Sequence, residues 1–175
     1  MKHIYSYLWT APFFILFQEL ILDNIGFTKY YINPLLYLIL IISLPQNTEK
    51  WFLIIYAFLL GISLDLFDGN IGINSSALVF IAFLKPSLNK ILIPKNYIDE
   101  KDKLGLKNLG IQTFSTYAVI IIFIHNCFWF LLERFSSLSI LEIWFLMLGI
   151  ILNTIVTFII ILIFELFTFK TKEKK

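Results

Sequence analysis

Apolar residues gather along the chain in six long runs that are separated by short polar stretches. A helix that spans a bilayer needs about 20 mostly apolar residues. The third and fourth runs reach that length only when each takes in a charged residue near its end, Asp65 or Lys85. We therefore predict six membrane-spanning helices in a single domain, residues 1–175. The predicted spans cover residues 4–22, 31–47, 51–67, 71–87, 109–132 and 142–167.

The composition indicates that lipid is the main solvent of this chain. Of the 175 residues, 59% are hydrophobic and 15% are charged, and the mean hydropathy is +0.84. A soluble domain of this size cannot bury so much apolar surface, because a large part of its exterior must face water. The expected fold class is an all-α integral membrane protein, a six-transmembrane-helix bundle. Cys127 is the only cysteine, which excludes an intrachain disulfide and a thiolate metal cluster.

The positions of the lysines predict the orientation of the spans. Six crossings place the N-terminus, the loop near Lys50, a polar loop at about 88–108 and the C-terminal tail on one side. That side holds 12 of the 14 Lys and Arg residues, and the other side keeps Lys29 and Arg134. By the positive-inside rule both termini are cytoplasmic. The first run lacks a clear small-residue cleavage site, so we expect a retained membrane helix rather than a removed signal peptide.

Residues 61–74 join the third and fourth runs and hold the acidic residue that lies deepest in an apolar region. We expect Asp65 and Asp68 to end the third helix at the outer water boundary and to start a turn, since Gly and Asn follow. Gly61 would let another helix come close, with Asp65 hydrogen-bonding across the contact. The candidate helix-packing or partner-contact residues are Gly61, Asp65, Asp68, Gly72 and Asn74.

Few other polar residues lie within the apolar runs. Glu19 and Glu165 lie near span ends, where a carboxylate can reach the interface, and Glu165 can also pair with Lys170. His125 has no second histidine or carboxylate at helical spacing, so we expect a hydrogen-bonding role inside the bundle rather than a metal site. Asn153 is expected to make a polar contact between helices. No catalytic, cofactor-binding or metal-binding residues are predicted.

Several short motifs lie near the ends of the predicted spans. They are Ile32–Tyr37, Leu44-Pro45, Trp51, Gly61–Asp65, Gly72–Asn74 and Ala82–Pro86. With the length and the hydropathy profile over all 175 residues, the chain resembles the rod shape-determining protein MreD family of small bacterial inner-membrane proteins. One difference is Lys85, because an arginine is expected before Pro86 in that family, but the positive charge is kept.

The resemblance implies a non-enzymatic scaffold of the cell-elongation machinery, which assists peptidoglycan synthesis in the lateral wall and the regulation of cell shape. It implies MreC as the most direct partner. The wider complex would include the MreB filament, the glycosyltransferase RodA and a class B penicillin-binding transpeptidase. The family is also similar in its six-helix bundle to the substrate-binding subunits of energy-coupling-factor vitamin transporters, which is an analogy of fold alone.

Two other classes of function stay open. A small-molecule-binding subunit of an energy-coupling-factor type transporter requires a polar cavity that opens outward. Its lining would be Glu19, Asp65, His125 and Asn153. An intramembrane enzyme requires two titratable groups to converge at membrane depth. A dry, well-filled bundle centre would favour the scaffold, and a deep pocket of ligand size would favour the transporter.

Overall fold

The computed structural model describes residues 2–22, 32–69, 72–94, 98–134 and 140–173. Over these residues the regular structure is helical, without a strand. The elements are α1 (Lys2–Phe17), the π-helical turn η1 (Gln18–Leu22), α2 (Leu38–Ile42), α3 (Lys50–Asp68), α4 (Ile73–Leu92), α5 (Leu106–Arg134) and α6 (Ile140–Glu173). Within the described ranges, four helices are long and apolar enough to cross a membrane. They are Lys50–Asp68, Ile73–Leu92, Leu106–Glu133 and Ile143–Thr168.

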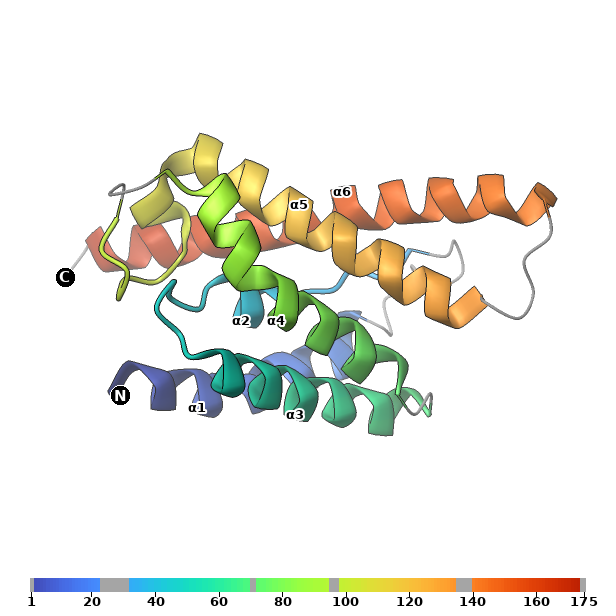
Figure 1. Cartoon of the computed structure of the whole chain (residues 1–175), viewed down its shortest axis with the longest axis horizontal. Coiled ribbons are helices and arrows are strands. Elements are labelled where there is room, and N and C mark those ends of the chain that lie inside the picture. Colours follow the sequence, from blue (N-terminus) through green and yellow to red (C-terminus); the bar gives the residue numbers. More distant parts are fainter. Residues whose placement is uncertain (1, 23–31, 70–71, 95–97, 135–139, 174–175) are drawn as a thin grey trace.

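The long helices pack on one another in chain order. From α3 onwards each helix contacts the next one, and α1 contacts α3. In Figure 1, α4 crosses between the α1 and α3 pair and the α5 and α6 pair, and α2 lies at the centre. The start of α1 and the end of α6 lie at the same end of the bundle (Figure 1). This arrangement leaves α2 enclosed by the long helices.

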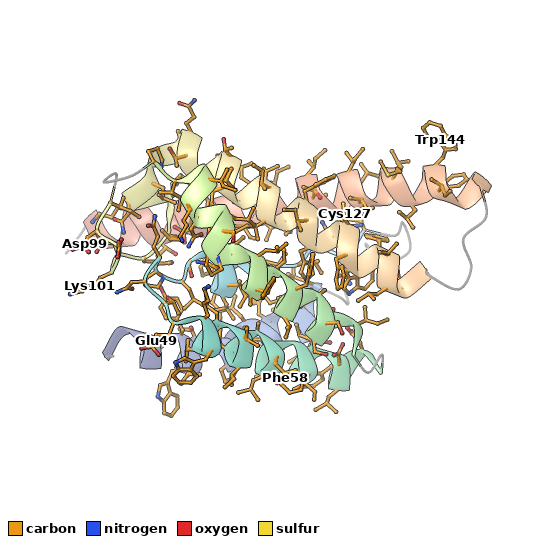
Figure 2. All side chains as sticks on the ribbon, viewed as in Figure 1. Glu49, Phe58, Asp99, Lys101, Cys127 and Trp144 are labelled. Carbon is orange, nitrogen blue, oxygen red and sulfur yellow. The ribbon has the colours of Figure 1, made fainter. Side chains whose placement is uncertain are left out.

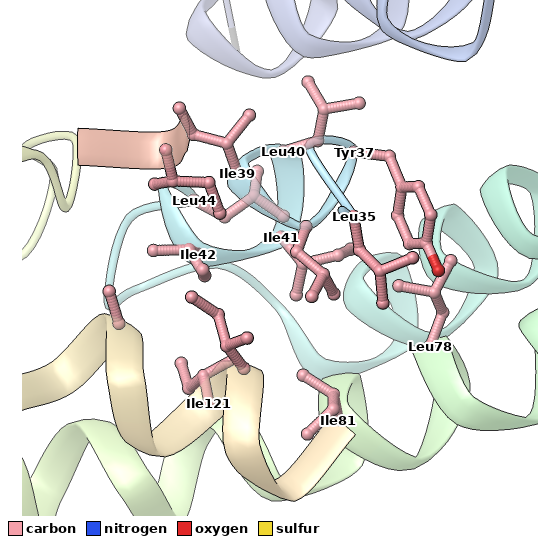
Figure 3. Close-up of a cluster of buried hydrophobic side chains, with 14 of the residues drawn as sticks. Leu35, Tyr37, Ile39, Leu40, Ile41, Ile42, Leu44, Leu78, Ile81 and Ile121 are labelled. Carbon is pink, nitrogen blue, oxygen red and sulfur yellow. The ribbon is translucent and has the colours of Figure 1, made fainter. Parts of the chain in front are cut away.

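The buried centre is the segment of residues 32–48 that contains α2, here called the central segment. Each side chain from residue 35 to residue 44 is at most 4% exposed. Figure 3 shows Ile41 and Ile42 of α2 facing Ile121 of α5 and Ile81 of α4. The central segment is therefore surrounded by protein rather than by lipid.

The sequence predicts a spanning helix over residues 31–47, but the structure has only the five residues of α2 there. Two prolines account for the difference. Pro34 and Pro45 lack an amide donor, and each disfavours helical backbone at the residue before it. Non-helical backbone at membrane depth is tolerated only where other groups of the protein satisfy its polar atoms. Side chains of five neighbouring elements do so here, as described below.

The fourth helix is longer than the sequence predicts. α4 continues through Pro86 to Leu92 and takes up part of the loop expected at 88–108. A proline inside a helix costs about 3 kcal/mol. Lys85 and Asn89, which are four residues apart, are both buried on the inward face of α4, so tertiary packing stabilises this end of the helix. α5 begins at Leu106 and contains a non-helical residue, Gly110, with φ 68° and ψ 165°.

The outer surface of the bundle is apolar along the helices. Trp144 is 76% exposed and Phe58 is 47% exposed, and Figure 2 shows both side chains pointing away from the bundle. Glu49, Asp99 and Lys101 lie at the end of the bundle where α1 begins (Figure 2). Long helices with exposed apolar faces are typical of lipid-facing surfaces. The structure thus indicates a membrane protein.

Candidate functional site

Gly61 lies where α3 touches the backbone of α4. A Cβ atom added at this position would come within 2.2 Å of Ser75 Cα and 2.6 Å of Ser75 N. A real Cβ atom cannot approach backbone atoms so closely, and glycine is the residue that lets two helices come together in this way. The contact positions the first turn of α4 against α3, one helical turn before Asp65.

Asp65 caps the start of α4 from the neighbouring helix. Its Oδ1 accepts a hydrogen bond from Asn74 N at 2.8 Å, and its Oδ2 accepts from the amides of Gly72 and Ser75, each at 3.1 Å. The first amides of a helix have no partner inside the helix and carry partial positive charge. A carboxylate is therefore well suited to bind them. Gly72 allows the turn before α4, because its φ of 103° disfavours other residues.

The position of Asp65 corrects the expectation that it ends α3 at the water boundary. α3 continues for almost one more turn to Asp68 and ends at Gly69, which has φ 70°. Asp65 is 0% exposed, since the three amides replace the water that a buried carboxylate needs. Asp68, at the end of the helix, is exposed.

Asn74 connects the α3–α4 hairpin to the rest of the bundle. Its Nδ2 donates a hydrogen bond to Asp68 Oδ2 at 2.6 Å. Its Oδ1 accepts hydrogen bonds from Trp129 Nε1 of α5 at 2.8 Å and from the hydroxyl of Tyr37 in the central segment at 3.5 Å. Asn74 is only 4% exposed. One amide side chain therefore joins α3, α4, α5 and the central segment.

The five candidate residues of the hairpin come together around the buried side chains of Asp65 and Asn74, in what is here called the Asp65 junction. Its members from the hairpin are Gly61, Asp65, Asp68, Gly72 and Asn74. Sequence reasoning missed Trp129 and Tyr37. The available signal was that a buried Trp or Tyr needs a hydrogen-bond partner for its polar atom. Contact of this junction with another protein stays a prediction.

A second buried carboxylate holds the start of α5. Glu165 Oε2 accepts a hydrogen bond from Leu106 N at 3.1 Å, and Oε1 accepts from Lys103 Nζ at 2.9 Å. A Cβ atom at Gly105 would lie 2.8 Å from Oε2, so glycine makes room for the carboxylate. The sequence suggested Lys170 as a partner, but the side chain of that residue lies outside the described part. We call this arrangement the Glu165 junction.

Polar side chains of η1 and α6 hold the first part of the central segment. Gln18 binds the backbone of residues 33–36 twice, donating at 2.9 Å and accepting at 3.0 Å. Asn153 and Thr157 of α6 accept hydrogen bonds from backbone amides of the same stretch, at 2.5 Å and 3.1 Å. Asn153 and Thr157 are four residues apart, which places both on one face of α6. Asn153 was predicted to contact another helix, but its partner here is the backbone amide of Asn33, which lies outside the helices.

Cationic and phenolic side chains hold the other end of the central segment. The backbone carbonyls of residues 42–44 accept hydrogen bonds from Lys85 Nζ at 2.7 Å, from the Tyr7 hydroxyl at 3.1 Å and from the Tyr117 hydroxyl at 3.5 Å. Lys85 lies near the end of the predicted fourth span, yet it is 0% exposed. The carbonyl of Leu44 accounts for this burial, because it accepts a hydrogen bond from the ammonium where water is excluded.

A small cavity lies between α5, α6 and the central segment. Its volume is about 10 Å³, and its lining consists of Asn33, Leu35, Asn126, Trp129, Phe130 and Asn153. Of the four residues expected to line a transport cavity, only Asn153 belongs to this lining. Asp65 is bound to α4, and His125 is fully buried with its ring edge toward Tyr37, at 6.1 Å between ring centroids. Glu19 lies in η1 and is partly exposed.

Metal ligation and comparison with known proteins give no further indication of function. In the described ranges, no three His, Cys, Asp or Glu side chains gather in a way that could hold a metal ion. No family model, curated protein or solved structure matches the chain. The function is therefore argued from the residues and their contacts.

Proposed function

We propose that this protein is a non-enzymatic membrane scaffold of the MreD type in the bacterial cell-elongation complex. It would contact MreC directly and work with MreB, RodA and a penicillin-binding transpeptidase in the wider complex. The Asp65 junction carries the proposal. Both carboxylate oxygens of Asp65 are engaged by three backbone amides, so the group positions a turn instead of moving protons. A carboxylate held in this way fixes the start of α4 against α3, which favours docking at the neighbouring surface.

The motifs that carry the family resemblance meet in space, which supports the proposal. Gly61–Asp65 and Gly72–Asn74 form the two sides of the Asp65 junction. Ala82–Pro86 contains Lys85, and the ammonium of Lys85 binds the carbonyl of Leu44 in another of the motifs. Short apolar motifs are weak signals one by one. The buried contacts give these four motifs a structural reason, whereas Trp51 is 61% exposed.

We further propose that the chain crosses the membrane six times, with both termini in the cytoplasm of a bacterial cell. The crossings would be α1, the central segment and α3 to α6. α1 starts and α6 ends at the same end of the bundle, which supports this topology (Figure 1). The 12 to 2 distribution of Lys and Arg between the two sides supports it as well. The test is a compartment-sensitive reporter fused to each terminus in turn. We expect both reporters in the cytoplasm, and opposite compartments would reject the topology.

Site-specific photocrosslinking in living rod-shaped cells tests the proposed partner. Phe67 is 58% exposed and lies next to the Asp65 junction, so a photoreactive residue there should capture MreC. Phe58 is a matched control, because it lies on the same helix, is 47% exposed and is about two and a half turns away. Capture of MreC from position 67 but not from position 58 is expected. Capture of lipid alone from both positions would reject the docking site.

The cavity beside Asn153 does not support the transporter alternative. Small-molecule sites usually enclose about 300–1,000 Å³, whereas the cavity beside Asn153 has about 10 Å³. A thermal-shift screen of the purified protein against water-soluble vitamins separates the two functions. We expect no stabilisation, and a concentration-dependent shift with one compound would favour the transporter.

A further inference from the structure

The small cavity beside Asn126 contains acceptor oxygens that lack donors. It has a volume of about 10 Å³, which is close to the room that one water molecule needs. Asn126 Oδ1 and Asn33 Oδ1 are both buried, and no donor among the described residues hydrogen-bonds to either oxygen. Both residues belong to the cavity lining. Asn126 itself is 1% exposed.

The orientation of the Asn126 amide follows from its neighbour Thr154. The Thr154 hydroxyl donates its hydrogen to Ile150 O at 2.7 Å, so its oxygen can only accept from Asn126. The amide group of Asn126 must therefore turn its NH₂ toward Thr154, and Nδ2 lies 3.1 Å from Oγ1. This leaves Oδ1 on the other side as an acceptor. Reversing the amide would place two acceptors against each other.

The polar side chains of Asn153 and Trp129 in the cavity lining have partners already. Asn153 Oδ1 accepts from Asn33 N, and Asn153 Nδ2 donates to Gly149 O at 2.9 Å. Trp129 Nε1 donates to Asn74 at 2.8 Å. A ligand of this cavity must therefore be about as small as one water molecule and must satisfy two acceptor oxygens.

We propose that the cavity binds a single water molecule, which donates one hydrogen to Asn126 Oδ1 and the other to Asn33 Oδ1. A buried polar atom without a hydrogen bond costs several kcal/mol in a lipid environment, so there is a strong driving force for binding. Buried waters typically make about three hydrogen bonds. A divalent metal cation would need six or more oxygen ligands, of which the cavity offers two. The water links α5 to the central segment close to the α6 contact.

Nuclear magnetic resonance of the full chain in micelles tests this site, using water itself as the probe. With asparagine labelled with nitrogen-15, we expect a water cross-peak of long residence time at the side-chain NH₂ of Asn126 and of Asn33. Asn89 is the matched control, because it is 5% exposed and bonded to Tyr117, and it is outside the cavity lining. No bound-water cross-peak is expected at Asn89. Absence of the cross-peaks from Asn126 and Asn33 would overturn the proposal.

Two further measurements sharpen the assignment. Asn126→Leu should abolish the cross-peak at Asn33 while the Trp129 indole resonance keeps its position, and persistence of the Asn33 cross-peak would count against the bridge. Replacing sodium chloride with N-methylglucamine chloride should leave all side-chain amide shifts unchanged. Shifts that depend on sodium would assign the cavity to a cation instead. If the variant does not fold, the cross-peaks of the wild-type protein still test whether the cavity binds water.

Discussion

α4 and α5 each begin at a buried carboxylate that another helix provides, but the two junctions differ in construction. Asp65 binds amides that lie seven to ten residues further along the chain, whereas Glu165 binds an amide 59 residues away. Asp65 is 0% exposed and engages three backbone amides. Glu165 engages one backbone amide and the ammonium of Lys103, whose side chain is 39% exposed.

Asp65 binds backbone amides in its junction. Glu165 also binds the charged side chain of Lys103, which is partly exposed. A short hairpin brings its own ends together at little entropic cost, so the Asp65 junction can form locally. The Glu165 junction depends on the folded bundle to bring α6 to the start of α5. We infer that the Asp65 junction is the more rigid and that the Glu165 junction responds to ionic strength.

The largest expected effect comes from removing the Asp65 carboxylate. Asp65→Ala leaves three helix-start amides without their acceptor, and we expect it to lower the free energy of unfolding by about 3–5 kcal/mol. Glu165→Ala leaves the Leu106 amide without its acceptor, whereas the Lys103 ammonium can reach water. We expect it to lower the free energy of unfolding by about 2 kcal/mol. Unfolding in mixed detergent micelles measures both. Equal losses would show that the two junctions are equivalent.

In cells, Asp65→Ala also tests the proposed function. The variant should insert into the membrane but lower the recovery of MreC and round the cells. Asp65→Asn keeps one acceptor oxygen and should show a weaker effect. Normal rods with wild-type recovery of MreC from Asp65→Ala cells would reject the scaffold function without affecting the stability prediction.

The next largest effect is expected at the glycine contact beside Asp65. Gly61→Ala would place a methyl group 2.2 Å from Ser75 Cα, which forces α3 and α4 apart and costs about 3 kcal/mol. Gly149→Ala in α6 is the matched control, since its Cβ would meet the Phe130 ring at 3.5 Å, an ordinary contact. The control should gain about 0.5–1 kcal/mol from helix propensity. The same micelle unfolding experiment should show opposite signs for the two substitutions.

A smaller effect is expected where the Asp65 junction is tied to α5. Trp129→Phe removes the indole donor to Asn74 Oδ1, and the loss of one buried hydrogen bond should lower the free energy of unfolding by about 1–2 kcal/mol. In the Asp65→Ala background the hairpin is already loosened, so we expect a smaller loss from Trp129→Phe. A double-mutant cycle measures this coupling. Strict additivity would show that the two contacts are independent.

The comparison also shows which parts of the fold could be predicted from the sequence. All-helical membrane character followed from the long apolar runs, because lipid requires each helix to satisfy its own backbone. The closeness of Gly61 to Asp65 was visible, since residues four apart share a helix face. The partners of Glu165 could not be predicted in this way. Lys103 and Leu106 reach Glu165 only through tertiary packing, because about 60 residues separate them along the chain.

The central segment shows what hydropathy alone does not predict. Residues 31–47 are as apolar as a spanning helix, and hydropathy cannot distinguish burial in lipid from burial in protein. Pro34 and Pro45 lie near the two ends of this predicted span, where a missing amide donor costs a helix little. In the structure the backbone around them is instead bound by side chains such as Gln18, Thr157 and Lys85. Each of these is a polar residue within or at the end of an apolar run, and its partner depends on the fold.

The smallest effect is expected at the exposed side of the Glu165 junction. Lys103→Met removes the ammonium but leaves Glu165 bound to Leu106 N. Partly exposed ion pairs contribute about 0.2–1 kcal/mol. At low salt concentration the loss in free energy of unfolding should be near the lower value of this range, and near 1 M salt it should vanish. Raising the salt concentration should leave the Asp65→Ala deficit almost unchanged, because its donors are buried amides. A salt-sensitive Asp65 deficit, or a Lys103→Met deficit that salt does not affect, would contradict the distinction between the two junctions.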